Sequence, residues 1–261
     1  MVKKRRVRRW GRELLLGIFA LVVVVVVAVA LYLSMGGSGG VPTTAKPKAL
    51  VADSLMLDYP NPDLIEHIVG VLKSAGYEVD VVTGRDVNLT LYSRLTDYDL
   101  VILRVHGGRA LYRTPDGKLH RLNGLFTGVP WSEEYRPLKR AWLATRAFPY
   151  NSTKAFVAAL PKFFDVMLSG KFRPGSVMIV ASCFSLYTSD IADALARKGL
   201  SMFIGWEGPV TLNHMDRVLR RLVDYAVGEG VPWPEAVKRV NEELGPDPTY
   251  GEPLKIVIYW R

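Results

Sequence analysis

The chain has 261 residues, of which 49% are hydrophobic and 23% are charged. That much apolar surface excludes a wholly disordered protein. A single cysteine excludes an intrachain disulfide, and with it the class of small disulfide-rich domains. The 34 lysines and arginines outnumber the 25 aspartates and glutamates, for a formal net charge of +9.

The positive charge is concentrated at the N-terminus. Residues 1–13 contain seven lysines and arginines and one glutamate, so this segment holds +6 of the total of +9. The other 248 residues carry only +3. We therefore expect no broad phosphate-binding face and no nucleic acid partner.

An uncharged apolar stretch, residues 14–33, follows this basic tail. A helix of that length spans ~30 Å at ~1.5 Å per residue, which is the thickness of the hydrocarbon core of a bilayer. The pattern predicts a transmembrane helix over residues 14–34, with the basic tail in the cytoplasm and the main domain outside the cell membrane. A cleaved signal peptide is the alternative, because Ala28, Ala30 and Ser34 offer small side chains for a cleavage site.

Residues 35–48 are rich in glycine, serine, proline and threonine, which is the composition of a flexible linker. By its length, the remainder of the chain, residues 49–261, should form one domain. Within it, short apolar runs alternate with segments of helical spacing, and several runs are hydrophobic throughout. This alternation predicts an α/β fold with a mostly parallel sheet and helices on both faces.

The expected elements follow in chain order. Strands are expected at 49–52, 78–82, 99–105, 176–181, 202–206 and 256–260, and helices at 62–75, 153–168, 189–198, 212–227 and 233–244. Between residues 109 and 131 the pattern predicts a hairpin, with the sequence Pro-Asp-Gly at 115–117 as its turn.

Two reactive side chains follow two of the apolar runs. His106 comes directly after VILRV, and Cys183 comes directly after VMIVAS. Because chemistry in such sheets takes place beyond the carboxyl ends of the strands, we expect the imidazole and the thiol to meet at one edge. Nucleophilic cysteine catalysis needs this pair, since the imidazole raises the fraction of reactive thiolate. The backbone N–H groups of Gly107 and Cys183 would then form an oxyanion hole.

Each of these residues has a plainer interpretation when it is taken alone. A cysteine after an apolar strand is most often a small buried side chain, and a His-Gly pair is common in loops. The matching positions of His106 and Cys183, together with the absence of any other cysteine, favour the catalytic interpretation.

These motifs resemble those of the caspase-like cysteine peptidases, a superfamily of caspases, legumains, gingipains, clostripains, separases and CHAT-domain proteins. The stretch SDIADALARKGLSMFIGWEGPV after Cys183 and the two last helices are similar to the CHAT pattern. The resemblance covers most of residues 49–245. It implies a caspase-like fold and peptide-bond hydrolysis, with His106 as general acid and base and Cys183 as nucleophile.

Two features depart from the family pattern. Ser182 stands where the superfamily usually has alanine. The separation of 77 positions from His106 to Cys183 exceeds the ~50 typical of caspases, and the hairpin and the helix expected between them account for the excess.

The resemblance also implies that the pocket for the residue before the scissile bond lies at the strand ends. Relatives that prefer arginine or lysine place acids there, and this chain has Asp53 and Asp58 after its first strand and Glu207 after the strand that follows the cysteine. Trp206 would line the same pocket. The alternative is that the acids are solvated loop residues and that the tryptophan packs in the core.

Three functions remain open from these residues. The leading hypothesis is a membrane-anchored cysteine endopeptidase that cleaves peptides or proteins, with a preference for basic residues. It needs no metal and no cofactor, since His67, His120 and His214 lack paired metal spacing and no phosphate-binding glycine motif is present. The alternatives are a non-catalytic receptor or scaffold domain of the same fold, and a flavodoxin-like ligand-binding module.

Overall fold

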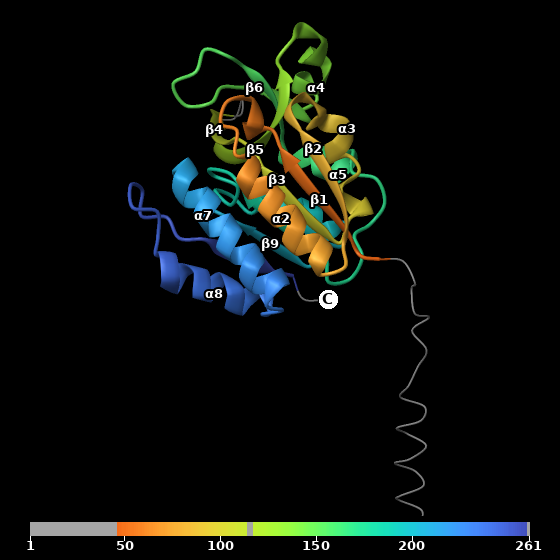
Figure 1. The fold of residues 1–261 in the computed structure, drawn as a ribbon. Coiled ribbons are helices and arrows are strands. Elements are labelled where there is room, and N and C mark those ends of the chain that lie inside the picture. The colour runs from red at the N-terminus through yellow and green to blue at the C-terminus, as the bar shows by residue number, and fades with distance from the viewer. Residues whose placement is uncertain (1–45, 114–116, 260–261) are drawn as a thin grey trace, which may run out of the picture. The chain divides into compact units, whose positions relative to one another are not determined.

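A six-stranded sheet forms the centre of the computed structural model, which describes residues 46–113 and 117–259 (Figure 1). Neighbouring strands run parallel except at one edge, where β10 is antiparallel to β9. In spatial order the strands are β10 (Lys255–Ile258), β9 (Met202–Gly205), β8 (Val177–Ala181), β3 (Leu100–Arg104), β1 (Lys48–Asp53) and β2 (Glu78–Thr83). The mostly parallel sheet predicted from the apolar runs is confirmed.

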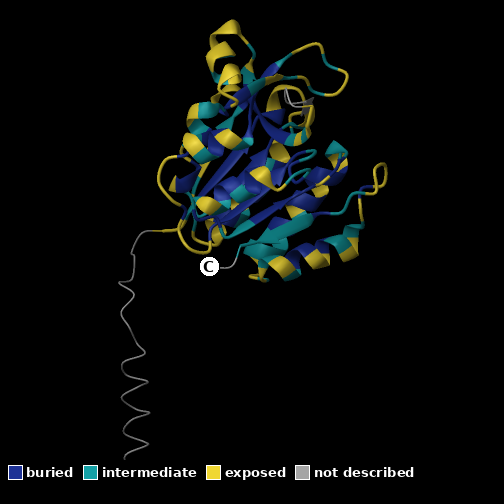
Figure 2. Ribbon diagram, turned by 180° about the vertical axis from the view of Figure 1, so that it is seen from behind, coloured by how far each residue is buried: buried dark blue, intermediate teal, exposed yellow. Residues whose placement is uncertain are grey.

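Helices cover both faces of this sheet, as predicted. The central strands β3 and β8 are buried at every position, and Figure 2 shows them in dark blue between helices whose outer sides are exposed. Burial on both faces is the reason these strands are apolar throughout instead of alternating. One face packs against α2 (Pro62–Ser74), α7 (Leu212–Val223) and α8 (Trp233–Leu244), and the other against α3 (Leu89–Tyr92), α5 (Pro161–Val166) and α6 (Asp190–Arg197).

The residues around α2 determine where this helix begins and ends. The side-chain oxygen of Asn61 accepts a hydrogen bond from the N–H of Leu64, and Pro62 occupies a first-turn position that needs no N–H donor. Gly76 follows the helix with a φ of +89°, which favours glycine. Only a short segment with the 3-10 turn Leu55–Leu57 separates β1 from α2, so the N-terminus of α2 lies at the carboxyl edge of the sheet.

A second, antiparallel sheet is inserted between β3 and β8. The hairpin predicted between residues 109 and 131 is confirmed as β4 and β5, although part of its expected turn, residues 114–116, lies outside the described residues. The sheet has the order β4 (Gly107–Arg113), β5 (Leu119–Pro130), β7 (Phe156–Ala159) and β6 (Ala144–Ala147), and the short helix α4 (Arg136–Arg140) connects β5 to β6.

The helix predicted over residues 153–168 is wrong in its first half. Residues Phe156–Ala159 form strand β7, which is buried at every position and pairs with β5 and β6. A run of four apolar residues is too short to distinguish the helical from the strand period, so its neighbours decide. Helix α5 begins only at Pro161, a residue suited to the first helical position.

The N-terminal predictions fall largely outside the described residues. This applies to the cytoplasmic tail, to the transmembrane helix over residues 14–34 and to most of the linker over residues 35–48. The end of that linker belongs to the folded domain, since Lys48 is the first residue of β1. Among the described residues, which start at Lys46, no helix has the length and apolar character to cross a membrane.

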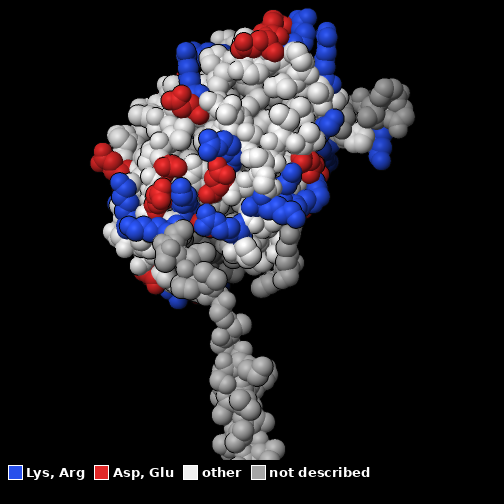
Figure 3. Space-filling view, turned by 90° about the vertical axis from the view of Figure 1, so that its right-hand side faces the viewer, with Lys and Arg blue, Asp and Glu red and all other residues white. Residues whose placement is uncertain are grey.

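Charged side chains of opposite sign are intermixed on the domain surface. On the face in Figure 3, basic and acidic side chains lie together in a belt across the lower part, and the area above the belt is mostly uncharged. Ion pairs such as Lys48–Glu78 and Arg197–Asp165 join the two signs directly.

Candidate active site

His106 and Cys183 follow two strands that are neighbours in the sheet. β3 and β8 run parallel, with Arg104 opposite Ala181. His106 and Cys183 each follow this pair by two residues, so both lie at the carboxyl edge of the sheet. Cys183 is hydrogen-bonded to Val210, just before α7, and His106 contacts Tyr59, just before α2, so both side chains lie towards the face covered by these helices. Cys183 packs against the hydrophobic core of that face.

Gly107 holds the histidine loop against the cysteine loop. A Cβ atom built on Gly107 would lie 2.1 Å from the carbonyl oxygen of Cys183 and 2.5 Å from Oγ of Ser182. No side chain larger than hydrogen fits in that space. The two loops therefore approach each other through their backbones, next to the predicted catalytic pair.

The thiol of Cys183 is half-buried and hydrogen-bonded to one residue of the loop before α7. The N–H of Val210 donates to Sγ at 3.4 Å, and Sγ lies 3.5 Å from the carbonyl oxygen of the same residue. Burial raises the pKa of the thiol, and the carboxylate of Asp247 acts in the same direction, while the Val210 N–H opposes them. The thiol is therefore protonated at neutral pH in this state.

The imidazole of His106 lies between two aromatic rings. The ring of Tyr59 meets it edge to face with centroids 6.1 Å apart, and the ring of Phe126 lies at 5.9 Å. Burial lowers the pKa of His106, the carboxylate of Asp58 raises it, and the guanidinium of Arg104 lowers it further. The net shift is downward, so the ring is neutral at pH 7.

One nitrogen of this ring is free to take part in proton transfer. Nε2 of His106 is buried and has no hydrogen-bond partner among the described residues. Buried polar atoms are nearly always paired, so the unpaired nitrogen calls for an explanation, and a role in catalysis is one that fits its place at a strand end. A neutral imidazole in this position can accept a proton.

A buried ion network lies beneath His106. Arg104, which is 1% exposed, donates from Nε and Nη2 to the carboxylate of Asp216 on α7 at 2.8 and 2.9 Å. Its Nη1 donates to Asp53 at the end of β1 and to the carbonyl oxygen of Tyr59, both at 3.1 Å. The network therefore fixes the backbone of the residue whose ring packs on the imidazole.

The network contradicts the prediction that Asp53 lines a substrate pocket. Asp53 is 1% exposed, and its carboxylate is already bound by Arg104. Trp206, predicted to line the same pocket, is fully buried and packs in the core with Val210 and Met215. Both side chains were placed at the strand ends by the sequence, but the tertiary structure turns them inward.

The other two predicted pocket acids are exposed. Asp58 lies close enough to affect the pKa of His106, and its Oδ1 is 4.0 Å from Nζ of Lys154. Glu207 instead lines a separate hollow with Tyr187 and Lys255, beside the edge strand β10. The structure therefore brings Asp58 to the imidazole and places Glu207 towards the other edge of the sheet.

Sequence reasoning missed several residues of this site. Arg104 carried a usable signal, because a charge within an otherwise apolar strand needs a buried partner. Tyr59, Phe126 and Val210 carried none, since aromatic and aliphatic residues in loops and strands have no pattern that points to a site. Their part in the site follows from contacts between segments far apart in the chain.

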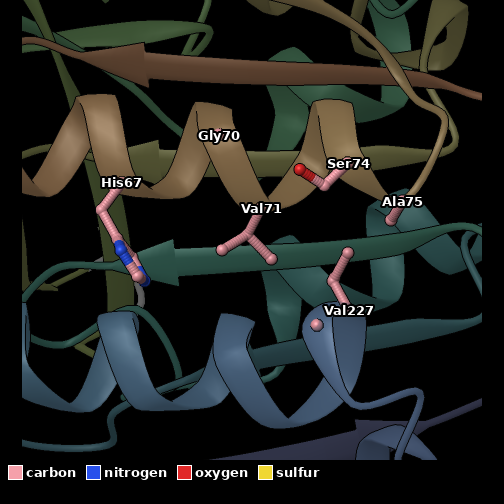
Figure 4. Close-up of a pocket in the computed structure, with 7 residues that line it drawn as sticks. His67, Gly70, Val71, Ser74, Ala75 and Val227 are labelled. Carbon is pink, nitrogen blue, oxygen red and sulfur yellow. The ribbon is translucent and has the colours of Figure 1, made fainter.

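A further hollow, of about 430 Å³, lies between α2 and the π-helical turn Asp224–Gly228 at the end of α7 (Figure 4). Nε2 of His67 forms a 2.6 Å contact with Oδ1 of Asp224 at its rim. Small and aliphatic side chains form most of its wall, and neither member of the predicted catalytic pair is among its lining residues.

The chain was also compared with known proteins. No model of a known protein family matches it, and no curated protein matches it in sequence. The interpretation of the site therefore depends on the site's own geometry and chemistry.

Proposed function

We propose that this chain is a membrane-anchored cysteine endopeptidase of the caspase-like kind, with Cys183 as nucleophile and His106 as general acid and base. The observation that carries the proposal is the position of the two residues, each two positions beyond a paired residue at the ends of neighbouring parallel strands. The close backbone approach at Gly107 and the unpaired Nε2 of His106 support it.

The reaction would proceed through an acyl-enzyme. As Sγ of Cys183 attacks the scissile carbonyl carbon, its proton passes to His106, and the carbonyl oxygen becomes an oxyanion near the N–H groups of Gly107 and Cys183. The C–N bond breaks as His106 returns the proton to the departing amine. Water then adds to the thioester while His106 takes its proton, and the carboxylic acid product leaves as the thiol is restored.

The thiol must turn before it can attack. Its hydrogen bonds to Val210 hold it against the core, but sulfur is a weak donor and a weak acceptor. Rotation about the Cα–Cβ bond of Cys183 therefore costs little compared with the energy of a bound peptide. Because the thiol and the imidazole both rest in their neutral forms, proton transfer accompanies the attack instead of preceding it.

Asp58 supports a preference for basic substrates. It is the predicted pocket acid that is both exposed and close to His106. A lysine or arginine of the substrate could replace Lys154, whose contact with Asp58 is long and exposed to solvent. The apolar segment at residues 14–34 and the basic tail before it support an anchored enzyme whose domain lies outside the membrane.

The test uses a library of peptidyl acyloxymethyl ketones, which label a cysteine only when it is activated and the peptide is bound. We expect wild-type full-length chain in detergent to be labelled at Cys183, as identified by mass spectrometry. The Cys183→Ala and His106→Ala variants should remain unlabelled, while His120→Ala, which changes a histidine of β5, should be labelled normally. Absence of labelling, or labelling that persists in His106→Ala, would refute the proposal.

A non-catalytic scaffold is the second candidate, and the raised pKa of the Cys183 thiol favours it. In that case the thiol would titrate near or above the ~8.5 of a free cysteine. Its reaction rate with iodoacetamide would then have the same pH dependence in the wild type and in His106→Ala. A dependence that changes with His106→Ala would favour the peptidase.

A further inference from the structure

Arg109 lies beside the candidate nucleophile and is held there by aromatic rings. Its guanidinium carbon is 4.9 Å from the ring centroid of Phe184 and 5.6 Å from that of Tyr187. The two rings themselves meet edge to face, with centroids 6.0 Å apart. Phe184 directly follows Cys183 in the chain, so the arginine is stacked on the loop that carries the thiol.

The backbone after Cys183 is bent in a way that presents these rings. Phe184 has a φ of +57°, in the left-handed region that bulky side chains rarely adopt. The bend is held by hydrogen bonds, since Phe184 N–H donates to the carbonyl oxygen of Gly208 and Tyr187 N–H donates to that of Phe184. Conformations of this kind persist where the surrounding structure enforces them, and they are concentrated at functional sites.

The guanidinium of Arg109 is exposed, and within the described part of the chain no carboxylate pairs with it. Stacking orients the planar group and reduces the entropy lost when it binds a ligand, while its N–H edge stays available. A carboxylate fits that edge through two parallel hydrogen bonds. An oriented, unpaired arginine therefore makes the surface beside the Cys183 loop suited to binding an anionic group.

We propose that Arg109, Phe184 and Tyr187 form a subsite for a carboxylate of the peptide substrate. The inference rests on the proposed peptidase function and adds a feature of its substrate. Because the guanidinium is stacked on Phe184, the neighbour of Cys183 in the chain, the carboxylate would belong to a residue close to the scissile bond.

This subsite would give the candidate site opposite charges on its two sides. Asp58 follows β1, on one side of the strand that leads to His106, whereas Arg109 is stacked on the loop that follows β8, on the other side. A substrate with a basic side chain on one side of the cut and an acidic side chain on the other would match both. Electrostatic complementarity of this kind selects among substrates and fixes their direction.

In the test, the full-length chain cleaves positional-scanning peptide mixtures. At each position in turn, the peptides carry either glutamate or glutamine. We expect glutamate to raise kcat/KM over glutamine about tenfold at one position close to the cut, and Arg109→Gln to remove that preference. Arg109→Lys should retain part of it, because the charge stays while the planar fork is lost. Arg146→Gln is the matched control, since Arg146 is stacked on Phe148 at 5.0 Å in β6, the far strand of the same sheet.

Two further comparisons make the outcome decisive. Peptides with free and with amidated C-termini distinguish binding of a side-chain carboxylate from binding of the terminal carboxylate. If Arg109 favours only peptides with a free C-terminus, the assignment to a side chain is wrong. If the ratio of kcat/KM for glutamate peptides to kcat/KM for glutamine peptides is the same in the wild type and in Arg109→Gln, the subsite proposal is wrong. The peptidase proposal would not be affected. If no peptide is cleaved, the peptidase proposal fails, and binding of the same mixtures, measured by fluorescence anisotropy, then shows whether Arg109 selects glutamate.

Discussion

At the scale of single residues, burial acts on the two members of the candidate pair in complementary ways. It lowers the pKa of His106 and raises that of Cys183, so both shifts favour the uncharged form. A preformed thiolate–imidazolium pair is therefore disfavoured before substrate binds. The charge that most favours a protonated His106 comes from Asp58, an exposed residue in a loop.

Replacing Asp58 with asparagine should shift the activity of the proposed peptidase to lower pH. The carboxylate raises the pKa of His106, so its loss lowers that pKa. Because the neutral imidazole is the proton acceptor, a lower pKa keeps it functional in more acidic solution. The acidic limb of kcat/KM against pH, and the titration of the His106 Cε1 proton by NMR, should both move downward.

The control for this experiment is Asp63→Asn, which removes an exposed carboxylate from the first turn of α2. Its profile should coincide with that of the wild type. A limb that moves to higher pH in Asp58→Asn, or an NMR titration that does not move, would show that Asp58 does not act on the imidazole.

At the scale of secondary-structure elements, the ion network of Arg104 joins β3, β1 and α7 below the site. Two carboxylates, Asp53 and Asp216, share one guanidinium, and Asn61 at the start of α2 donates to Asp216 at 2.9 Å. A network of this kind contributes little to stability compared with apolar packing, but breaking it is costly, because the charges left behind are unpaired and buried.

Replacing Arg104 with methionine should reduce the free energy of unfolding by ~3–5 kcal/mol, as measured by urea denaturation. Asp53→Asn should cost less, since burial already raises the pKa of Asp53 and so disfavours its charge. Arg94→Met, which breaks an exposed ion pair with Asp97, is the control and should change stability little. If Arg104→Met and Arg94→Met reduce the free energy of unfolding by the same amount, the network is not coupled to folding.

At the scale of the whole molecule, the folded domain begins earlier than the composition of the linker indicates. The carbonyl oxygen of Pro47 accepts a hydrogen bond from Glu78 N–H at 2.8 Å, and Lys48 N–H donates to Oδ2 of Asp99 at 2.7 Å. These bonds attach the start of β1 to the strands on either side of it.

A chain that starts at Lys46 should therefore be more stable than one that starts at Ala49. Loss of these bonds should cost ~1–3 kcal/mol, at roughly 1 kcal/mol for each hydrogen bond. Thermal unfolding of the two purified domains provides the measurement, and the longer one should have the higher Tm. Identical Tm values would mean that the first residues of β1 are frayed in solution.

Features that depend on local pattern could be predicted from the amino-acid sequence. Apolar runs without alternation indicate strands buried on both faces, and helical spacing between them indicates the helices that bury them. The position of His106 and Cys183 after two such runs was enough to predict that they share one edge of the sheet. The hairpin followed from its turn residues.

Which side chains face that edge, and which are buried beneath it, depends on contacts that form only in the folded chain. Asp53 was expected to line a substrate pocket, but it is buried in an ion pair with Arg104. The other carboxylate of the network, Asp216, is 112 residues away from Arg104 in sequence. The same holds for the strand at Phe156–Ala159, whose conformation is fixed by pairing on both sides. Contacts between distant segments leave no periodic trace in the sequence, because each partner is compatible with many neighbours until the chain folds.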